Sequence, residues 1–139
     1  MIDRDTFESW PKKKQKDYVK RMYPIVSKQV IQTFRREGLA KDKTGKIRDV
    51  VHHCWEKGMG GSIPLWYYID KRNMLPWSDS MHKTYHDVDR DKWTPAQKLE
   101  AKEAERIKQE MITDNKKYHK HDTSGLPEFN SVKDVLKTL

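Results

Sequence analysis

Residues 46–88, KIRDVVHHCWEKGMGGSIPLWYYIDKRNMLPWSDSMHKTYHDV, decide the fold that we predict for this chain. Apolar side chains over residues 46–55 predict a strand, and Met74–Trp77 predicts a short second strand. Ser78 is a preferred N-cap residue, so a helix is expected to begin directly after it. Residues 63–69 are apolar and aromatic, and they fit either a strand or a short buried turn.

Four of the six histidines lie within this stretch, and their spacing predicts a metal site. His52 and His53 are neighbours on the first strand, so they point to opposite faces, and one can bind a metal while the other stays free. His82 and His86 are spaced i and i+4 on the helix, which places two imidazoles side by side in reach of one ion. Asn73 is expected at the turn just before this helix, where its side-chain amide can bond backbone groups across the bend and fix how strand and helix meet.

The residues before this stretch predict two amphipathic helical segments. Ser9 is expected to cap the first helix, with Pro11 in its first turn. Pro24 is expected to kink or break the helix. A second segment then ends near Arg36, with Gly38 just beyond it.

The residues after it predict a long charged helix from Thr94-Pro95 to about Lys117. Its narrow apolar stripe consists of Ala96, Leu99, Ala104, Ile107 and Met111. Such a helix lies along the domain or projects from it, and a dimerisation arm is the alternative. Residues 118–127 have the composition of a loop, in which His119 and His121 are expected to be solvated, and residues 131–139 are expected to dock back as a short amphipathic turn.

The length of 139 residues predicts a single domain of the α+β class with a modest core. Its regions are a basic helical part (1–45), the central part (46–90), and the long helix with a docked tail (91–139). The only cysteine, Cys54, cannot form an internal disulfide, which is typical of a reducing compartment. With no signal peptide and no apolar run long enough to span a membrane, the chain is expected to be cytoplasmic and not to act at a membrane.

The net charge of +8 arises in the N-terminal third of the chain. Residues 1–48 hold 14 Lys and Arg against 6 Asp and Glu, whereas residues 49–93 hold 6 against 7. A field of one sign attracts a polyanion, and nucleic acid is the usual one; a solvated basic face without a partner is the alternative. The candidate contacts to the phosphate backbone are Lys12, Lys13, Lys14, Lys16, Lys20, Arg21, Lys28, Arg35, Arg36, Lys46 and Arg48.

The order His52-His53, Asn73, His82-x-x-x-His86 resembles that of the HNH nucleases of the His-Me finger (ββα-metal) superfamily. The version of the pattern in colicin- and pyocin-type DNases is the most similar. The resemblance covers about residues 46–88 and implies a ββα-metal core there; the predicted basic helices and the long charged helix flank this core and lie outside the resemblance. Two features depart from the pattern: a longer insertion between His53 and Asn73, and the absence of the CxxC pairs that brace many phage members.

The resemblance implies a role for each of these residues in a metal-dependent endonuclease acting on double-stranded DNA. His53 would be the general base that takes a proton from water. His52, His82 and His86 would hold one divalent metal ion, which would stabilise the leaving 3′-oxygen. Asn73 would brace the site, and cleavage would leave 5′-phosphate and 3′-hydroxyl ends.

Three histidines favour zinc or nickel over magnesium or manganese in affinity, although the metal that supports turnover is left open. Two other functions are also left open. One is a non-catalytic DNA-binding module in which the histidines hold a structural metal, and the other is an RNase that uses the same site. Small nucleases with this motif are frequent in phages and mobile elements, and the resemblance favours such an origin.

Overall fold

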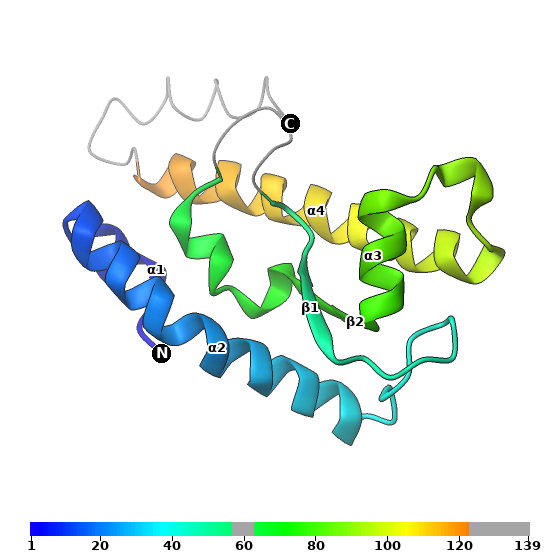
Figure 1. Cartoon of the computed structure of the whole chain (residues 1–139). Helices are drawn as coiled ribbons and strands as arrows, with labels where there is room; N and C mark the ends of the chain where they lie inside the picture. The colour runs from blue at the N-terminus through cyan, green and yellow to red at the C-terminus, as the bar shows by residue number, and fades with distance from the viewer. Residues whose placement is uncertain (57–62, 123–139) are drawn as a thin grey trace.

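The computed structural model of the chain describes residues 1–56 and 63–122, with side chains up to residue 119. Over these residues it is a small α+β fold with four α-helices and a two-stranded antiparallel sheet (Figure 1). The elements in chain order are α1 (Arg4–Glu8), α2 (Lys12–Arg36), β1 (Val50–His53), η1 (Leu65–Tyr68), η2 (Lys71–Asn73), β2 (Met74–Trp77), α3 (Asp79–Asp87), η3 (Arg90–Lys92) and α4 (Pro95–Asp122).

The hairpin of β1 and β2 is the middle layer, and helices cover both of its faces (Figure 1). His53 lies opposite Met74 in the antiparallel register, and Met74 packs with Val26 and Val30 of α2. His52 lies opposite Leu75, which belongs to the larger core shared with α3 and α4. Neighbouring strand residues therefore send their side chains to different helices.

The larger core is rich in aromatic rings, which compensates for the low apolar content of the sequence. Trp77, Tyr67 and Phe7 are completely buried in it. Helix α4 contributes small and flexible side chains along one stripe, namely Ala101, Ala104, Ile107 and Met111. Leu99 was expected to belong to this stripe, but it is 53% exposed, because the buried face at that turn is occupied by Glu100 and Ala101.

The N-terminal helices differ from the prediction. Ser9 does not cap the long helix but ends the short helix α1, and Pro11 stands at the N-cap of α2. Helix α2 continues through Pro24 without a break. Because Pro24 has no backbone N–H, it cannot donate to the carbonyl of Lys20, four residues earlier. Lys20 lies on the exposed side of the helix, where water can bond that carbonyl. Burial on the other side, for example of Val26, holds both halves of α2 in place.

The central elements agree with the prediction more closely. β2 has the predicted bounds, and the Ser78 side chain accepts a hydrogen bond from the Met81 backbone N–H at 3.2 Å, so it caps α3 as expected. β1 is shorter than predicted because only Val50–His53 pair with β2. Of the two possibilities for residues 63–69, the buried turn is the observed one, since Leu65–Tyr68 form a 3-10 helix.

Helix α4 extends beyond the predicted end at Lys117 and reaches Asp122. His119 therefore lies on this helix rather than in a loop, and it is exposed. The glycine bend at 58–61 and the docked tail at 131–139 lie outside the described residues. None of the described helices is long and apolar enough to cross a membrane.

Candidate metal centre

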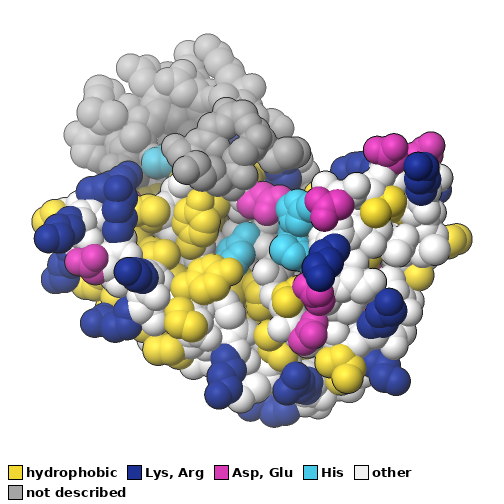
Figure 2. All heavy atoms as spheres, viewed as in Figure 1, with side chains coloured by type: hydrophobic (Ala, Val, Ile, Leu, Met, Phe, Trp, Pro, Cys, Tyr) yellow, Lys and Arg dark blue, Asp and Glu magenta, His cyan; other side chains and the backbone are white. Residues whose placement is uncertain are grey.

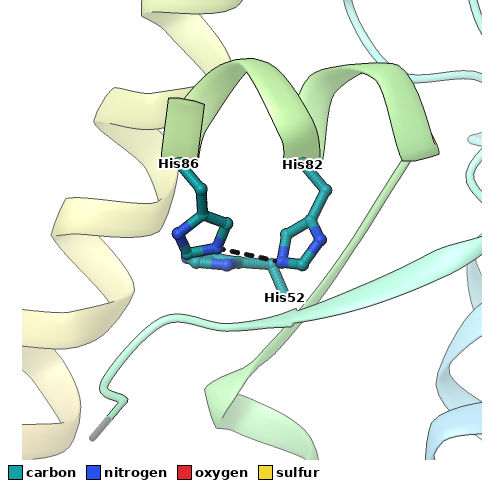
Figure 3. A group of neighbouring side chains, drawn as sticks. All are labelled: His52, His82 and His86. Carbon is teal, nitrogen blue, oxygen red and sulfur yellow. Dashed lines mark hydrogen bonds between the residues drawn. The ribbon is translucent and has the colours of Figure 1, made fainter. Parts of the chain in front are cut away.

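Three histidines converge between β1 and α3 (Figure 3). His52 points up from β1, and His82 and His86 point down from successive turns of α3. One ring nitrogen of each lies within 4.8 Å of those of the other two. The predicted ligands of the metal thus share one position in the fold, although they are separated by up to 34 residues of sequence.

His52 is the buried member of this group. Its side chain is 1% exposed, its ring stacks on Trp77 with centroids 4.2 Å apart, and neither ring nitrogen has a hydrogen-bond partner. Burial, together with the charges of His82 and His86, lowers the pKa of His52 to about 3. Its imidazole is therefore neutral at neutral pH and offers a lone pair that no protein group uses, which is what a metal ligand requires.

The distance between the other two ligands also fits a metal ion. The Nε2 atoms of His82 and His86 are 3.1 Å apart. Two nitrogens bound tetrahedrally to one zinc ion at about 2.05 Å lie about 3.3 Å apart. Burial lowers the pKa of His82, and the neighbouring charge of His86 lowers it further, which favours the neutral form that binds metals.

The group is closed on the His52 side and open on the His86 side, where the side chain is exposed. A cavity of ≈ 240 Å³ adjoins His86, and its lining includes Glu56, Arg90 and Lys108. Among residues 1–56 and 63–119, no fourth histidine, cysteine or carboxylate joins the three histidines. Three protein ligands with an open side are the usual arrangement of a catalytic zinc site, whereas structural sites have four.

A buried polar network holds the ring on which His52 stacks. Trp77 donates from Nε1 to Glu100 Oε1 at 3.1 Å, and Glu100 forms an ion pair of 3.3 Å with Arg48. Arg48 was expected to contact nucleic acid, but the structure places it within this network. The side chain is buried, and it also donates to the carbonyl of Pro76 at 2.6 Å and to that of Leu39 at 3.0 Å, so its guanidinium is used within the protein.

His53 lies on the other face of the hairpin, as the alternation along a strand predicts. Its side chain is 9% exposed, and its ring stacks on Tyr23 of α2. His53 Nε2 lies 3.2 Å from the backbone carbonyl oxygen of Tyr68. A carbonyl only accepts hydrogen bonds, so Nε2 carries the proton and Nδ1 holds the lone pair. Burial lowers the pKa of His53, and the charge of His82 lowers it further. The hydrogen bond to the Tyr68 carbonyl raises the pKa but does not offset burial, so the ring is neutral at neutral pH.

Asn73 joins the two ends of the loop between β1 and β2. Its Oδ1 accepts from the Trp55 backbone N–H at 2.7 Å, and its Nδ2 donates to the carbonyls of Trp55 and Tyr67 at 3.0 Å each. The side chain is completely buried. These bonds are the bracing geometry expected of Asn73, while its part in a reaction stays a prediction.

The other candidate contacts to nucleic acid are exposed basic side chains of α2 (Lys12, Lys13, Lys14, Lys16, Lys20, Arg21, Lys28, Arg35 and Arg36) and Lys46. Lys46 donates to the hydroxyl of Ser80, at the start of α3, two residues before His82 and three before Lys83. Figure 2 shows histidine side chains in the middle of one face, with hydrophobic side chains on one side of them and Asp and Glu side chains directly beside them. Lys and Arg side chains lie nearer the edges of this face.

Comparisons with known protein families, with curated proteins and with solved structures find no match to this chain. Sequence reasoning missed Trp77, Tyr23 and Glu100 as parts of the site. Trp77 follows the residue opposite His52 by two positions, so the register of the hairpin would have placed both on one face. Tyr23 and Glu100 lie on helices that are far in sequence from the histidines, so no residue spacing in the sequence indicates that they belong to the site.

Proposed function

We propose that this chain is a metal-dependent endonuclease that hydrolyses phosphodiester bonds of DNA. The observation that carries the proposal is the convergence of three imidazoles, one of which is buried with both ring nitrogens free of protein partners. Leaving a buried polar group without a partner costs free energy, so such an arrangement points to a ligand that is part of the functional protein. The order β1, β2, α3, with the ligands on β1 and α3, is what a ββα-metal core requires.

The residues of this chain have separate roles in the proposed reaction. His52, His82 and His86 would hold one divalent cation, which when bound supplies positive charge for a phosphate oxygen and for the leaving 3′-oxygen. His53 takes the proton of the attacking water at Nδ1, because Nε2–H is bonded to the Tyr68 carbonyl. Asn73 donates to the carbonyl of Tyr67, the residue before Tyr68, and so keeps this part of the loop between the strands in place.

The substrate would be held by charge rather than by reading of bases. The exposed basic side chains of α2 contact phosphates, which carry no sequence information. Binding is therefore expected to weaken steeply with salt, because each neutralised phosphate releases a counterion. Zinc or nickel is expected to bind the three imidazoles most tightly, while magnesium or manganese are the other metals to test for turnover.

One observation favours a second function, a non-catalytic DNA-binding module with a structural metal. His53 is only 9% exposed, and a general base must reach a water molecule beside the substrate. In that function His53 would serve only to pack against Tyr23. The two functions differ in what the loss of the His53 imidazole does.

A cleavage assay on plasmid DNA and on single-stranded DNA, with each of the four metals, separates them. The endonuclease predicts cleavage by the wild type, and a loss of about 10²-fold or more in rate for His53→Ala with metal binding retained. Equal cleavage by both proteins, or no cleavage of either DNA with any of the metals, would refute it. His119→Ala is the matched control, since His119 is an exposed histidine of α4, and it should cleave like the wild type. Single-stranded RNA in a parallel reaction tests for an RNase.

A further inference from the structure

Tyr23 presents an aromatic surface next to the proposed general base. Its ring stacks on that of His53, with centroids 5.0 Å apart and planes inclined by 22°. Its side chain is nevertheless 37% exposed, among the few large hydrophobic side chains that remain exposed in the described part of the chain. One face of the ring thus covers His53, and within the described residues no other ring packs on it.

Other features of this region suit a nucleotide. Tyr68, half-buried, also adjoins His53, with its ring centroid 6.1 Å from that of His53, so the proposed general base has two aromatic neighbours. Burial raises the pKa of Tyr23, and its phenol therefore stays neutral and does not repel a phosphate. On the face of the molecule in Figure 2, hydrophobic side chains lie on one side of the central histidines, with cations nearer the edges; the Asp and Glu side chains on this face lie beside the histidines.

Two of these cations lie on the same side of α2 as Tyr23. Lys20 precedes it by three residues and Lys16 by seven, so both project from the Tyr23 side, about 4.5 and 10.5 Å along the helix. Both are exposed, and neither forms an ion pair within the described residues. Lys28, five residues after Tyr23, projects from a different side of the same helix.

We propose that Tyr23 stacks an unpaired base of the strand that is cut, so that the preferred substrate is single-stranded DNA or DNA with unpaired bases at the cleavage position. This proposal rests on the proposed function and names the substrate class of the same site. Positively charged side chains beside an aromatic ring, such as Lys16 and Lys20 beside Tyr23, are the usual means of binding single strands. The cations contact the phosphates, and any unpaired base can stack on the ring. In an intact duplex each base is already stacked on its neighbours and offers no face to Tyr23.

Tyr23 also supports His53, and the test has to separate the two roles. Loss of support for His53 would lower the cleavage rate, but it would leave DNA binding without metal unchanged. Loss of a stacking surface would weaken binding even when no cleavage occurs. Binding to a single strand and to a duplex in the presence of a chelator is therefore the deciding measurement.

The experiment measures fluorescence anisotropy of a labelled 15-nucleotide single strand and of the matching duplex, with a chelator present. The full-length wild type is compared with Tyr23→Leu, Tyr23→Phe and the charge control Lys28→Gln. Tyr23→Leu is expected to weaken single-strand binding roughly tenfold and duplex binding little, whereas Tyr23→Phe keeps wild-type affinity for both. Lys28→Gln is expected to weaken binding of both substrates by a similar, small factor.

Equal loss of affinity for both substrates in Tyr23→Leu, or no loss for either, would overturn the proposal. So would tighter binding of the duplex than of the single strand by the wild type. Circular dichroism shows whether each variant is folded. If Tyr23→Leu is unfolded, Tyr23→Phe supplies the test, because a loss of single-strand affinity in Tyr23→Phe would contradict stacking. The cleavage assay reads the proposed function separately, because it uses the wild type and His53→Ala with metal present.

Discussion

Acidification of the metal-free protein from pH 7 to pH 5 is predicted to lower its free energy of unfolding by about 2 kcal/mol through His52 alone. The pKa of His52 is lowered from 6.5 to about 3 in the folded protein, first by burial and then by the charges of His82 and His86. At pH 5 the unfolded chain binds a proton at this residue, and the folded chain does not. Stability is therefore complete above pH 6.5 and falls with pH until about pH 3, by about 1.4 kcal/mol for each unit.

His52→Phe is the variant that isolates this effect, because a phenyl ring can stack on Trp77 but does not titrate. Urea denaturation with a chelator at pH 7 and pH 5 gives the loss of stability for both proteins. The wild type should lose about 2 kcal/mol more than His52→Phe. Carboxylates with lowered pKa values, such as Asp42 and Asp114, whose side chains accept hydrogen bonds, affect both proteins alike. Equal losses in the two proteins would refute the assignment of a buried, neutral His52.

Three further predictions concern the groups around the histidines. Asn73→Ala removes three buried hydrogen bonds and should cost about 3 kcal/mol in urea denaturation; a loss below 1 kcal/mol would contradict its bracing role. Arg48→Met leaves the carboxylate of Glu100 buried and unpaired, and should cost roughly 3–5 kcal/mol, most of it recovered when Glu100→Gln is added; a variant as stable as the wild type would show that the pair is not buried. Trp77→Leu removes the ring on which His52 stacks and should weaken nickel binding in calorimetry about tenfold, while Trp77→Phe changes it little; equal affinities in the two variants would contradict this.

The parts of the fold that could be predicted from the sequence are those with a local cause. β2 and the start of α3 have the predicted bounds, because an apolar run followed by Ser78 specifies both within a few residues. The opposite directions of His52 and His53 follow from the period of any strand. The approach of His82 to His86 follows from the period of any helix.

The parts that were missed depend on contacts between distant segments. Arg48 looks like a surface cation in the sequence, and only its pairing with Glu100, 52 residues later, makes it a buried one. Pro24 is a helix breaker by local rules, but the burial of one side of α2 outweighs the lost hydrogen bond. The stacking of Tyr23 on His53 likewise joins α2 to β1, and no spacing within either segment indicates it.

Metal titration by calorimetry tests the central claim, the separation of ligands from the base, most directly. The wild type and His53→Ala are each predicted to bind one zinc or nickel ion per chain with similar affinity. His82→Ala and His86→Ala are predicted to lose this binding by a factor of at least ten, since each removes one of three ligands. Absence of metal binding by the wild type, or unchanged binding after loss of either helix histidine, would contradict the account.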